Sequence, residues 1–235
     1  MRLSFLYRLL AVVFGVSWCC ATGFAQTSGT PLPNAPDHSA GSTQDRGFPP
    51  HFAKYIGPGQ TAQRLSAVDK FKLAGREQVQ PYSFFTQAVA AGWEHLLDSN
   101  PKYGTDKAGF GERLGAAALR QCSQSFFTDG LFASAFHQDP RYYRKGTGKI
   151  VGRIVYAATR VAVTRGDSGD AEPNYAAFAG HAATGALTMT YYPAVSATWH
   201  DTAEGYPLSF VGTVIGYEVH EFVPDLIRLA HRSRH

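Results

Sequence analysis

Residues 84–101 read FFTQAVAAGWEHLLDSNP, and this stretch decides the fold class. Apolar side chains recur in it at every fourth position, at Phe85, Val89, Trp93 and Leu97. This spacing places them on one face of a helix, because an α-helix turns once in about 3.6 residues. Pro101 ends the pattern, since the residue before a proline avoids the helical region. The stretch therefore predicts an amphipathic helix that packs against other helices.

Further segments along the chain have helical spacing or composition. They span residues 62–78, 108–137, 149–165, 173–191 and 207–231. We expect Thr105 and Asp106 to cap the second of these, a possible break in it at Asp129–Gly130, and a kink or division of the last at Pro224.

Residues 149–165 also alternate well enough to form a strand, and both interpretations stay open there. Elsewhere the helix-length segments are joined by short breaks rich in Pro and Gly. This arrangement predicts an all-α fold, an irregular bundle of about five or six helices.

Residues 1–25 have the layout of a secretory signal peptide. Arg2 and Arg8 precede a short apolar run, and Gly23-Phe24-Ala25 supplies the small residues of a cleavage site. The run is too short to cross a bilayer comfortably, which takes about 20 residues. We therefore expect an exported protein of the periplasm or cell envelope, associated with a membrane or free of it.

The Pro- and Gly-rich segment 26–60 predicts a disordered linker, because it offers few apolar groups to offset the entropy lost on ordering. The remaining residues, 61–235, predict a single helical domain. We expect no disulfide, since Cys122 is the only cysteine after the leader.

The charge balance limits the classes of partner. Loss of Arg2 and Arg8 with the leader lowers the net charge from +4 to +2, which does not support binding to nucleic acid. Low charge and many aromatic residues suit contact with a membrane surface or another envelope protein. Two small-xxx-small patterns, Gly111–Gly115 and Gly212–Gly216, predict close helix packing in water or in lipid. The sequence does not define an oligomeric state.

The densest polar cluster is residues 137–144. His137 could act as a base oriented by Asp139, and Arg141 could hold an anionic group through its planar guanidinium. The favoured interpretation is structural: Asp139 and Pro140 form a turn, the tyrosines pack over the core, and the arginines face solvent.

A second candidate is residues 218–225, where His220 and Glu221 lie among acids. A zinc-binding helix needs another histidine four residues after the first, and Pro224 occupies that position. Other histidines, such as His95, His181 and His200, would have to supply ligands, and no spacing selects one of them. We predict no metal and no cofactor.

Several motifs together resemble a group of uncharacterised exported bacterial envelope proteins to which no function is assigned. They lie at Leu32–Pro36, Gly109–Arg113, His137–Tyr143, Thr164–Gly169, Tyr191–Pro193 and Glu221–Asp225. The resemblance implies export from a bacterial cell and transfers no catalytic residue.

Two functional hypotheses follow. The leading one is a non-enzymatic structural or interaction role at a membrane surface. The alternative is an envelope hydrolase or lipid-modifying enzyme that uses His137, Asp139 and Arg141, together with His220 and Glu221.

Overall fold

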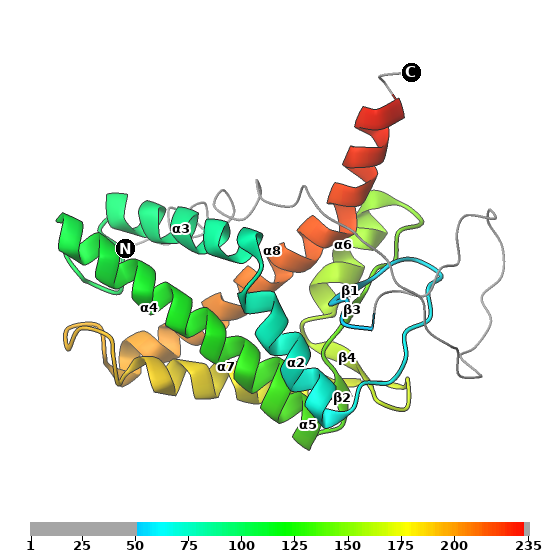
Figure 1. Ribbon diagram of the computed structural model, residues 1–235, viewed down its shortest axis with the longest axis horizontal. Coiled ribbons are helices and arrows are strands. Elements are labelled where there is room, and N and C mark those ends of the chain that lie inside the picture. The colour runs from blue at the N-terminus through cyan, green and yellow to red at the C-terminus, as the bar shows by residue number, and fades with distance from the viewer. Residues whose placement is uncertain (1–50, 233–235) are drawn as a thin grey trace.

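The structure, a computed structural model, describes residues 51–232. The predicted signal peptide and residues 26–50 of the predicted linker lie outside the described residues. The described chain is mainly helical, so the predicted all-α class is confirmed. Figure 1 shows its helices: α2 (Ala67–Gln78), α3 (Pro81–Leu96), α4 (Lys107–Ser125), α6 (Ile150–Thr159), α7 (Tyr175–Thr188) and α8 (Trp199–Arg232).

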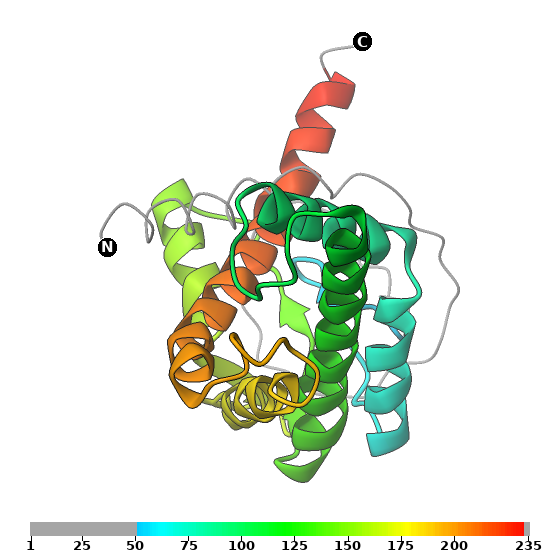
Figure 2. The same ribbon diagram turned by 90° about the vertical axis from the view of Figure 1, so that its left-hand side faces the viewer.

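The helices form an irregular bundle in which α2, α4, α7 and α8 follow one another around the molecule (Figure 2). α3 packs along α4, and α6 packs against α8 on the other side. The C-terminal end of α8, drawn in red in Figure 1, projects from the body of the bundle.

The helix starts follow from side chains that satisfy the first free amides. The Ser66 hydroxyl accepts from the backbone N–H of Asp69, and the Asp69 carboxylate accepts from that of Ser66, which is a capping box. The Asp106 carboxylate accepts from the backbone N–H of Gly109 at 2.9 Å, so the cap predicted at residues 105–106 is present.

The break predicted at Asp129–Gly130 is a change of helix type. α4 passes directly into a π-helix, η1 (Phe126–Phe132), and then into a short turn, α5 (Ala133–Ala135). η1 packs against α2, α4 and α7. Gly180 of α7 contacts Thr128 of η1 so closely that a Cβ atom on this glycine would overlap with that threonine.

Short strands lie at the end of the bundle away from α3. β1 (Tyr55–Ile56) pairs in parallel with β3 (Tyr142–Tyr143). β4 (Val163–Gly166) pairs antiparallel with both β2 (Gln138–Asp139) and β5 (Ala171–Pro173).

These strands correct two predictions. The predicted linker extends too far, because residues 51–60 include β1 and are paired into the fold. Residues 149–165 contain both of the structures left open for them, since helix α6 ends at Thr159 and β4 begins at Val163.

The start of the last helix and the role of the glycine pairs are also corrected. The last helix begins earlier than predicted, at Trp199, and of the two outcomes expected at Pro224 division does not occur, because the helix continues through it to Arg232. The glycine pairs Gly111–Gly115 and Gly212–Gly216 do not mediate close packing among the described residues, because a Cβ atom at any of the four positions would meet nothing within 4 Å.

The interior of the described chain is unusually polar. The largest fully buried side chains are Arg113, Tyr142, Lys70, Ile56, Leu73, Gln138, Glu221 and Thr184. Because a buried charge is costly without a partner, such side chains must be paired with each other or with the backbone. The pairings decide which polar residues are available for function.

Candidate functional site

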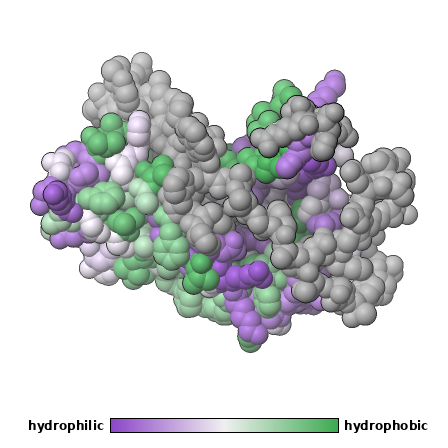
Figure 3. Space-filling model, turned by 45° about the horizontal axis from the view of Figure 1, so that its top comes forward, coloured by the Kyte–Doolittle hydropathy of each residue, from purple (hydrophilic) through white to green (hydrophobic). Residues whose placement is uncertain are grey.

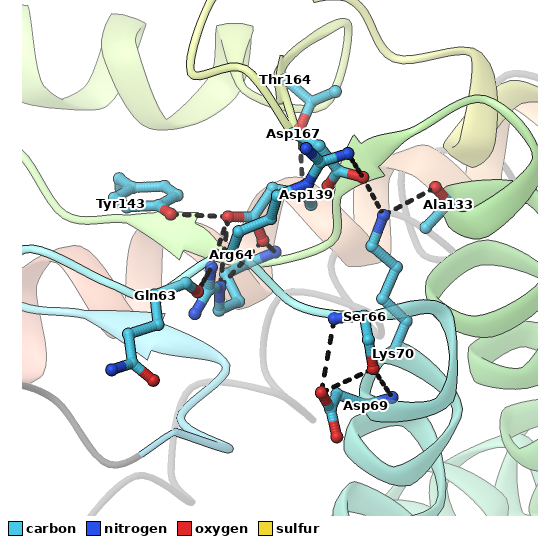
Figure 4. Close-up of polar contacts among 11 residues, drawn as sticks. Gln63, Arg64, Ser66, Asp69, Lys70, Ala133, Asp139, Tyr143, Thr164 and Asp167 are labelled. Atoms are coloured by element: carbon cyan, nitrogen blue, oxygen red, sulfur yellow. Dashed lines mark hydrogen bonds and ion pairs between the residues drawn. The ribbon is translucent and has the colours of Figure 1, made fainter. Parts of the chain in front are cut away.

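Asp139 and Arg141 form a closed pair where β2 leads into β3. The Arg141 guanidinium donates to both Asp139 carboxylate oxygens, with Nε–Oδ1 at 2.9 Å and a second nitrogen 2.8 Å from Oδ2. The Tyr143 hydroxyl donates to the same carboxylate at 2.6 Å (Figure 4). Arg141 also donates to the backbone carbonyl of Gln63 at 2.6 Å. Both charged side chains are buried, so this pair joins the chain before α2 to β2 and β3.

His137 does not take part in this pair. Its side chain is exposed, and its backbone adopts φ 55°, in the left-handed region. Its carbonyl accepts from the backbone N–H of Asp167 at 2.7 Å. The Asp139 oxygens are engaged by Arg141 and Tyr143, and Asp139 therefore does not orient His137 as a base.

Next to this pair, Figure 4 shows a second buried ion pair between α2 and the turn that follows β4. Lys70 donates to Asp167 at 2.8 Å and to the backbone carbonyl of Ala133 at 3.1 Å. Arg64 lies 3.5 Å from the same carboxylate. Lys70 is 1% exposed, and its contacts attach α2 to the end of the helix that contains η1.

Glu221 is the centre of a third cluster and is completely buried in α8. Its carboxylate accepts from Arg153 of α6 at 2.8 Å, from the Tyr142 hydroxyl at 2.9 Å, and from the backbone amides of Lys145 and Gly146. Burial alone would raise the pKa of Glu221, but these hydrogen bonds lower it, so the carboxylate is ionised.

Two arginines extend the Glu221 cluster along α8. Arg144 and Arg153 each lie 2.7 Å from Asp225 and each donate to the backbone carbonyl of Glu221. Their hydrogen bonds and charges lower the pKa of Asp225 despite its burial. The side chains of Arg141 and Arg144, expected to face solvent, are instead buried and paired with carboxylates. The cluster holds α6 and the loop before it against α8.

His220 faces a different side of α8. Its ring stacks on Tyr55 of β1, with centroids 3.2 Å apart and an interplanar angle of 15°. Burial, and to a lesser degree the charge of Lys54, lowers the pKa of His220 to about 3. The imidazole is therefore neutral at physiological pH.

The fourth polar cluster was not predicted. Lys54, two residues before Ile56 of β1, donates to Asp129 of η1 and lies 3.7 Å from Glu77 of α2. Burial raises the pKa of Glu77 to about 7, in opposition to the charge of Lys54. Lys54 lies within the predicted linker. Only its position directly before the short apolar stretch Tyr55–Ile56 indicates in the sequence that it is part of the fold.

The candidate residues thus lie at separate places. Asp139 and Arg141 pair with each other, Glu221 pairs with Arg153, His220 stacks on Tyr55, and His137 is exposed. Within residues 51–232, no three His, Cys, Asp or Glu side chains are grouped in a way that could hold a metal ion. Cys122 is exposed and forms no disulfide within the described residues.

The remaining candidate is a surface rather than a polar cluster. Helix α6 buries Arg153 and Ala157 and exposes aliphatic side chains on the opposite face. The exposed fractions are 67% for Ile150, 70% for Val151, 44% for Ile154 and 56% for Val155. This is the reverse of the usual arrangement in a soluble bundle, where the apolar face of a helix packs inward.

The projecting end of α8 continues this surface. Leu226 and Leu229 are each 61% exposed, and Arg228 and His231 lie beside them. Figure 3 shows hydrophobic side chains, in green, gathered over α6 and the end of α8 beside hydrophilic ones, in purple. We call the exposed side chains of residues 150, 151, 154, 155, 226 and 229 the α6–α8 surface.

The charged residues of α6 and of the segments on either side of it are all basic. Residues 145–165 contain Lys145, Lys149, Arg153, Arg160 and Arg165 and no acidic residue. Lys145 and Lys149 are exposed at the start of α6, whereas Arg153 faces inward. An apolar helix face with exposed cations at its edge is typical of helices that lie on a membrane surface.

Comparisons with protein-family models, curated proteins and solved structures find no match to this chain. None of the helices between residues 51 and 232 is long and apolar enough to span a membrane.

Proposed function

We propose that this protein is exported to the cell envelope and acts there without catalysis, by binding a membrane surface through the α6–α8 surface. The observation that carries the proposal is the outward apolar face of α6. α6 buries an arginine and exposes Ile150, Val151, Ile154 and Val155. Contact of these apolar side chains with water is unfavourable unless a membrane or another molecule covers them.

Charge complementarity favours an anionic lipid headgroup region as that cover. Each lysine or arginine near an anionic bilayer contributes about 1 kcal/mol, and Lys145 and Lys149 are exposed beside the apolar face. Transfer of four half-exposed aliphatic side chains into the interface adds a few kcal/mol at roughly 25 cal/mol per Å². These terms support reversible binding rather than permanent insertion.

The exposed apolar side chains of α3 lack the neighbouring cations that α6 has, which supports the choice of α6 for the membrane contact. α3 exposes Phe84 and Leu96, at 58% and 80%. Residues 81–98, however, contain the acids Glu94 and Asp98 and no lysine or arginine. α3 therefore lacks the exposed cations that an anionic membrane attracts, so we assign the membrane contact to α6 and α8.

The alternative hypothesis of an envelope hydrolase or lipid-modifying enzyme gains no support from these contacts. It requires His137, Asp139, Arg141, His220 and Glu221 to converge. Instead, Asp139 and Arg141 pair with each other, Glu221 pairs with Arg153, His220 stacks on Tyr55, and His137 is exposed.

Flotation with lipid vesicles tests the proposal. The protein is purified after export, in the form that its host cell processes, and mixed with vesicles of phosphatidylglycerol and phosphatidylcholine. We expect binding that weakens as salt rises or as the anionic lipid is removed. The double variant Val151→Asn, Val155→Asn should bind at least about tenfold more weakly, because two apolar side chains no longer enter the interface.

Leu96→Asn on α3 is the control, since it removes an even more exposed apolar side chain from a helix that carries no lysine or arginine. It should leave vesicle binding unchanged. Equal binding by the α6 double variant and the unsubstituted protein, or an equal loss in the α3 variant, would contradict the proposal.

A further inference from the structure

A small pocket of about 10 Å³ lies between α6, α8 and the strands β3 and β4. Arginines and tyrosines make up most of its lining, which consists of Arg141, Tyr142, Tyr143, Tyr156, Arg160, Val163, Thr164, Arg165 and Tyr217. Among the described residues no carboxylate lines it. A lining that carries positive charge and no negative charge favours an anionic ligand.

Arg141 does not supply the charge for such a ligand. Its guanidinium donates to both carboxylate oxygens of Asp139 and to the backbone carbonyl of Gln63. The pair of Arg141 and Asp139 is neutral overall. The net charge of the pocket therefore comes from Arg160, which follows α6 directly, and from Arg165 of β4.

Arg160 and Arg165 have donors to spare. Within residues 51–232 neither guanidinium forms an ion pair or a side-chain hydrogen bond. Both side chains are half-buried. Only Nε of Arg160 is enclosed without a partner, so the two terminal nitrogens of Arg160 and the whole Arg165 guanidinium are accessible. These accessible N–H groups can donate to a ligand.

Two tyrosine rings hold the two arginines in position. The guanidinium carbon of Arg160 lies 4.9 Å from the centre of the Tyr156 ring, and that of Arg165 lies 4.4 Å from the centre of the Tyr143 ring. The Tyr156 hydroxyl donates to the backbone carbonyl of Tyr143 at 2.7 Å, which ties the two rings together. A ring face attracts a guanidinium but gives its N–H groups no oxygen acceptor. The two cations are therefore positioned and still need acceptors.

The size of the pocket and its charge indicate the kind of anion. A space of about 10 Å³ holds one water-sized atom, so a ligand can insert a single oxygen while its other oxygens meet the guanidinium groups from outside. A phosphate monoester has three terminal oxygens and a charge close to −2 at neutral pH. It matches two unpaired guanidinium groups, whereas a carboxylate, a sulfate ester or a phosphodiester carries one negative charge only.

We propose that Arg160 and Arg165 bind the phosphate group of a soluble phosphate monoester, with one phosphate oxygen inserted between the tyrosine rings. Arg160 follows Arg153 by seven residues, or about two helical turns, so it lies on the inward side of α6 and away from Ile150 and Val151. A membrane bound to the α6–α8 surface does not reach this side. The ligand is therefore a soluble molecule rather than a lipid headgroup, and its binding does not depend on the proposed membrane contact.

Phenyl phosphate and phenyl sulfate test this inference by calorimetry on the exported protein, because they share a body and a tetrahedral head group but differ in charge. At pH 7.5 we expect phenyl phosphate to bind with a Kd of about 0.1–1 mM, a range set by its size, and phenyl sulfate at least about tenfold more weakly. At pH 5, below the second phosphate pKa of about 6, both carry one charge and the preference should fall below about threefold. Equal binding at pH 7.5, no binding of phenyl phosphate, or a preference kept at pH 5 would overturn the proposal.

Three variants locate the binding. Arg160→Gln and Arg165→Gln should each weaken binding of phenyl phosphate at least about tenfold, since each removes one of the two charges. Arg76→Gln on α2 is the matched control, because Arg76 is also without an ion pair among the described residues but lies elsewhere, exposed on the surface. It should leave binding unchanged. Unchanged binding in both pocket variants, or an equal loss in Arg76→Gln, would refute the site, and the comparison of the two probes remains available if a variant does not fold.

Flotation of Arg160→Gln separates a soluble ligand from a lipid headgroup. Vesicles that contain phosphatidic acid present a phosphate monoester, whereas those that contain phosphatidylglycerol present a diester. We expect the variant to bind both kinds of vesicle within about twofold of the unsubstituted protein. A loss of binding confined to phosphatidic acid vesicles would assign the site to a lipid headgroup and contradict the proposal of a soluble ligand.

Discussion

At the scale of single residues, the buried charges of this protein are used to connect segments that lie far apart in sequence. Lys54 joins α2 and η1, Lys70 joins α2 to the turn after β4, and Glu221 joins α6 to α8. Each charge has partners of opposite sign or backbone donors, which is the condition for tolerating it in a protein interior. Removal of one partner of such a pair therefore lowers the free energy of unfolding by more than the buried area of the removed group suggests.

Glu221→Gln measures the strength of one such connection. The variant keeps the size of the side chain but removes one of the two carboxylates that pair with the buried Arg153 guanidinium and leaves only Asp225. We expect the free energy of unfolding, from urea titration, to fall by about 3–5 kcal/mol.

Glu204→Gln is the control, because its carboxylate is exposed and pairs only with exposed His200. It should change stability by less than about 0.5 kcal/mol. A similar small effect in both variants would show that the Glu221 cluster does not stabilise the fold.

His220 predicts a specific dependence of stability on pH. Its pKa is about 3 in the folded protein and about 6.5 in an unfolded chain, so the unfolded state binds its proton first as the pH falls. Between pH 6.5 and pH 5 the folded state should therefore lose about 2 kcal/mol, at 1.36 kcal/mol per pH unit.

The variant His220→Phe keeps a ring to stack on Tyr55 but has no titrating group. Its stability should lack this loss, while contributions from other groups, such as Glu77, cancel in the comparison. Unfolding titrations of both proteins at pH 7 and pH 5 provide the test. Parallel behaviour of the two proteins would mean that His220 is accessible to protons in the folded state.

At the scale of elements, helix starts and stops could be predicted because they depend on local chemistry. Asp106 caps α4 through an amide three residues away, and Pro101 lies just after α3. The two- and four-residue strands could not be predicted in this way. β1 exists only because β3, more than eighty residues further along the chain, lies beside it, and its two residues have no detectable periodicity.

The candidate site was less predictable than the helices for a related reason. The apolar residues of segment 149–165 have helical spacing, but this spacing does not say whether the apolar face points inward. Arg153 determines the orientation, because its partners Glu221 and Asp225 lie inside. Only the fold brings those partners together, since they are separated from Arg153 by about seventy residues.

The contact between α7 and η1 gives a prediction at this scale. Gly180→Ala would place a Cβ atom against Thr128 of the π-helix, and we expect a loss of about 1–3 kcal/mol in the free energy of unfolding. Gly115→Ala in α4 is the matched control, since a Cβ atom there meets nothing within 4 Å. It should stabilise the protein by about 0.5–1 kcal/mol through helix propensity. Stabilisation by both substitutions would show that α7 and η1 are not in tight contact.

At the scale of the whole molecule, the proposed membrane contact occupies one end of the bundle. The α6–α8 surface lies at the end where the last helix projects, and α3 and α4 lie toward the other end. The Glu221 cluster holds α6 against α8 beneath this surface. Substitutions of the exposed residues on the α6–α8 surface should therefore change vesicle binding and leave the circular dichroism spectrum unchanged, because none of them takes part in that cluster.

The parallel pairing of β1 with β3 also bears on the order in which the fold can close. A ribosome makes the chain from its N-terminus, so Tyr55 and Ile56 have no strand to pair with until residues 142 and 143 exist. Glu221, which orders the loop after β3, is made later still. The chain therefore completes its fold only after α8 has been synthesised.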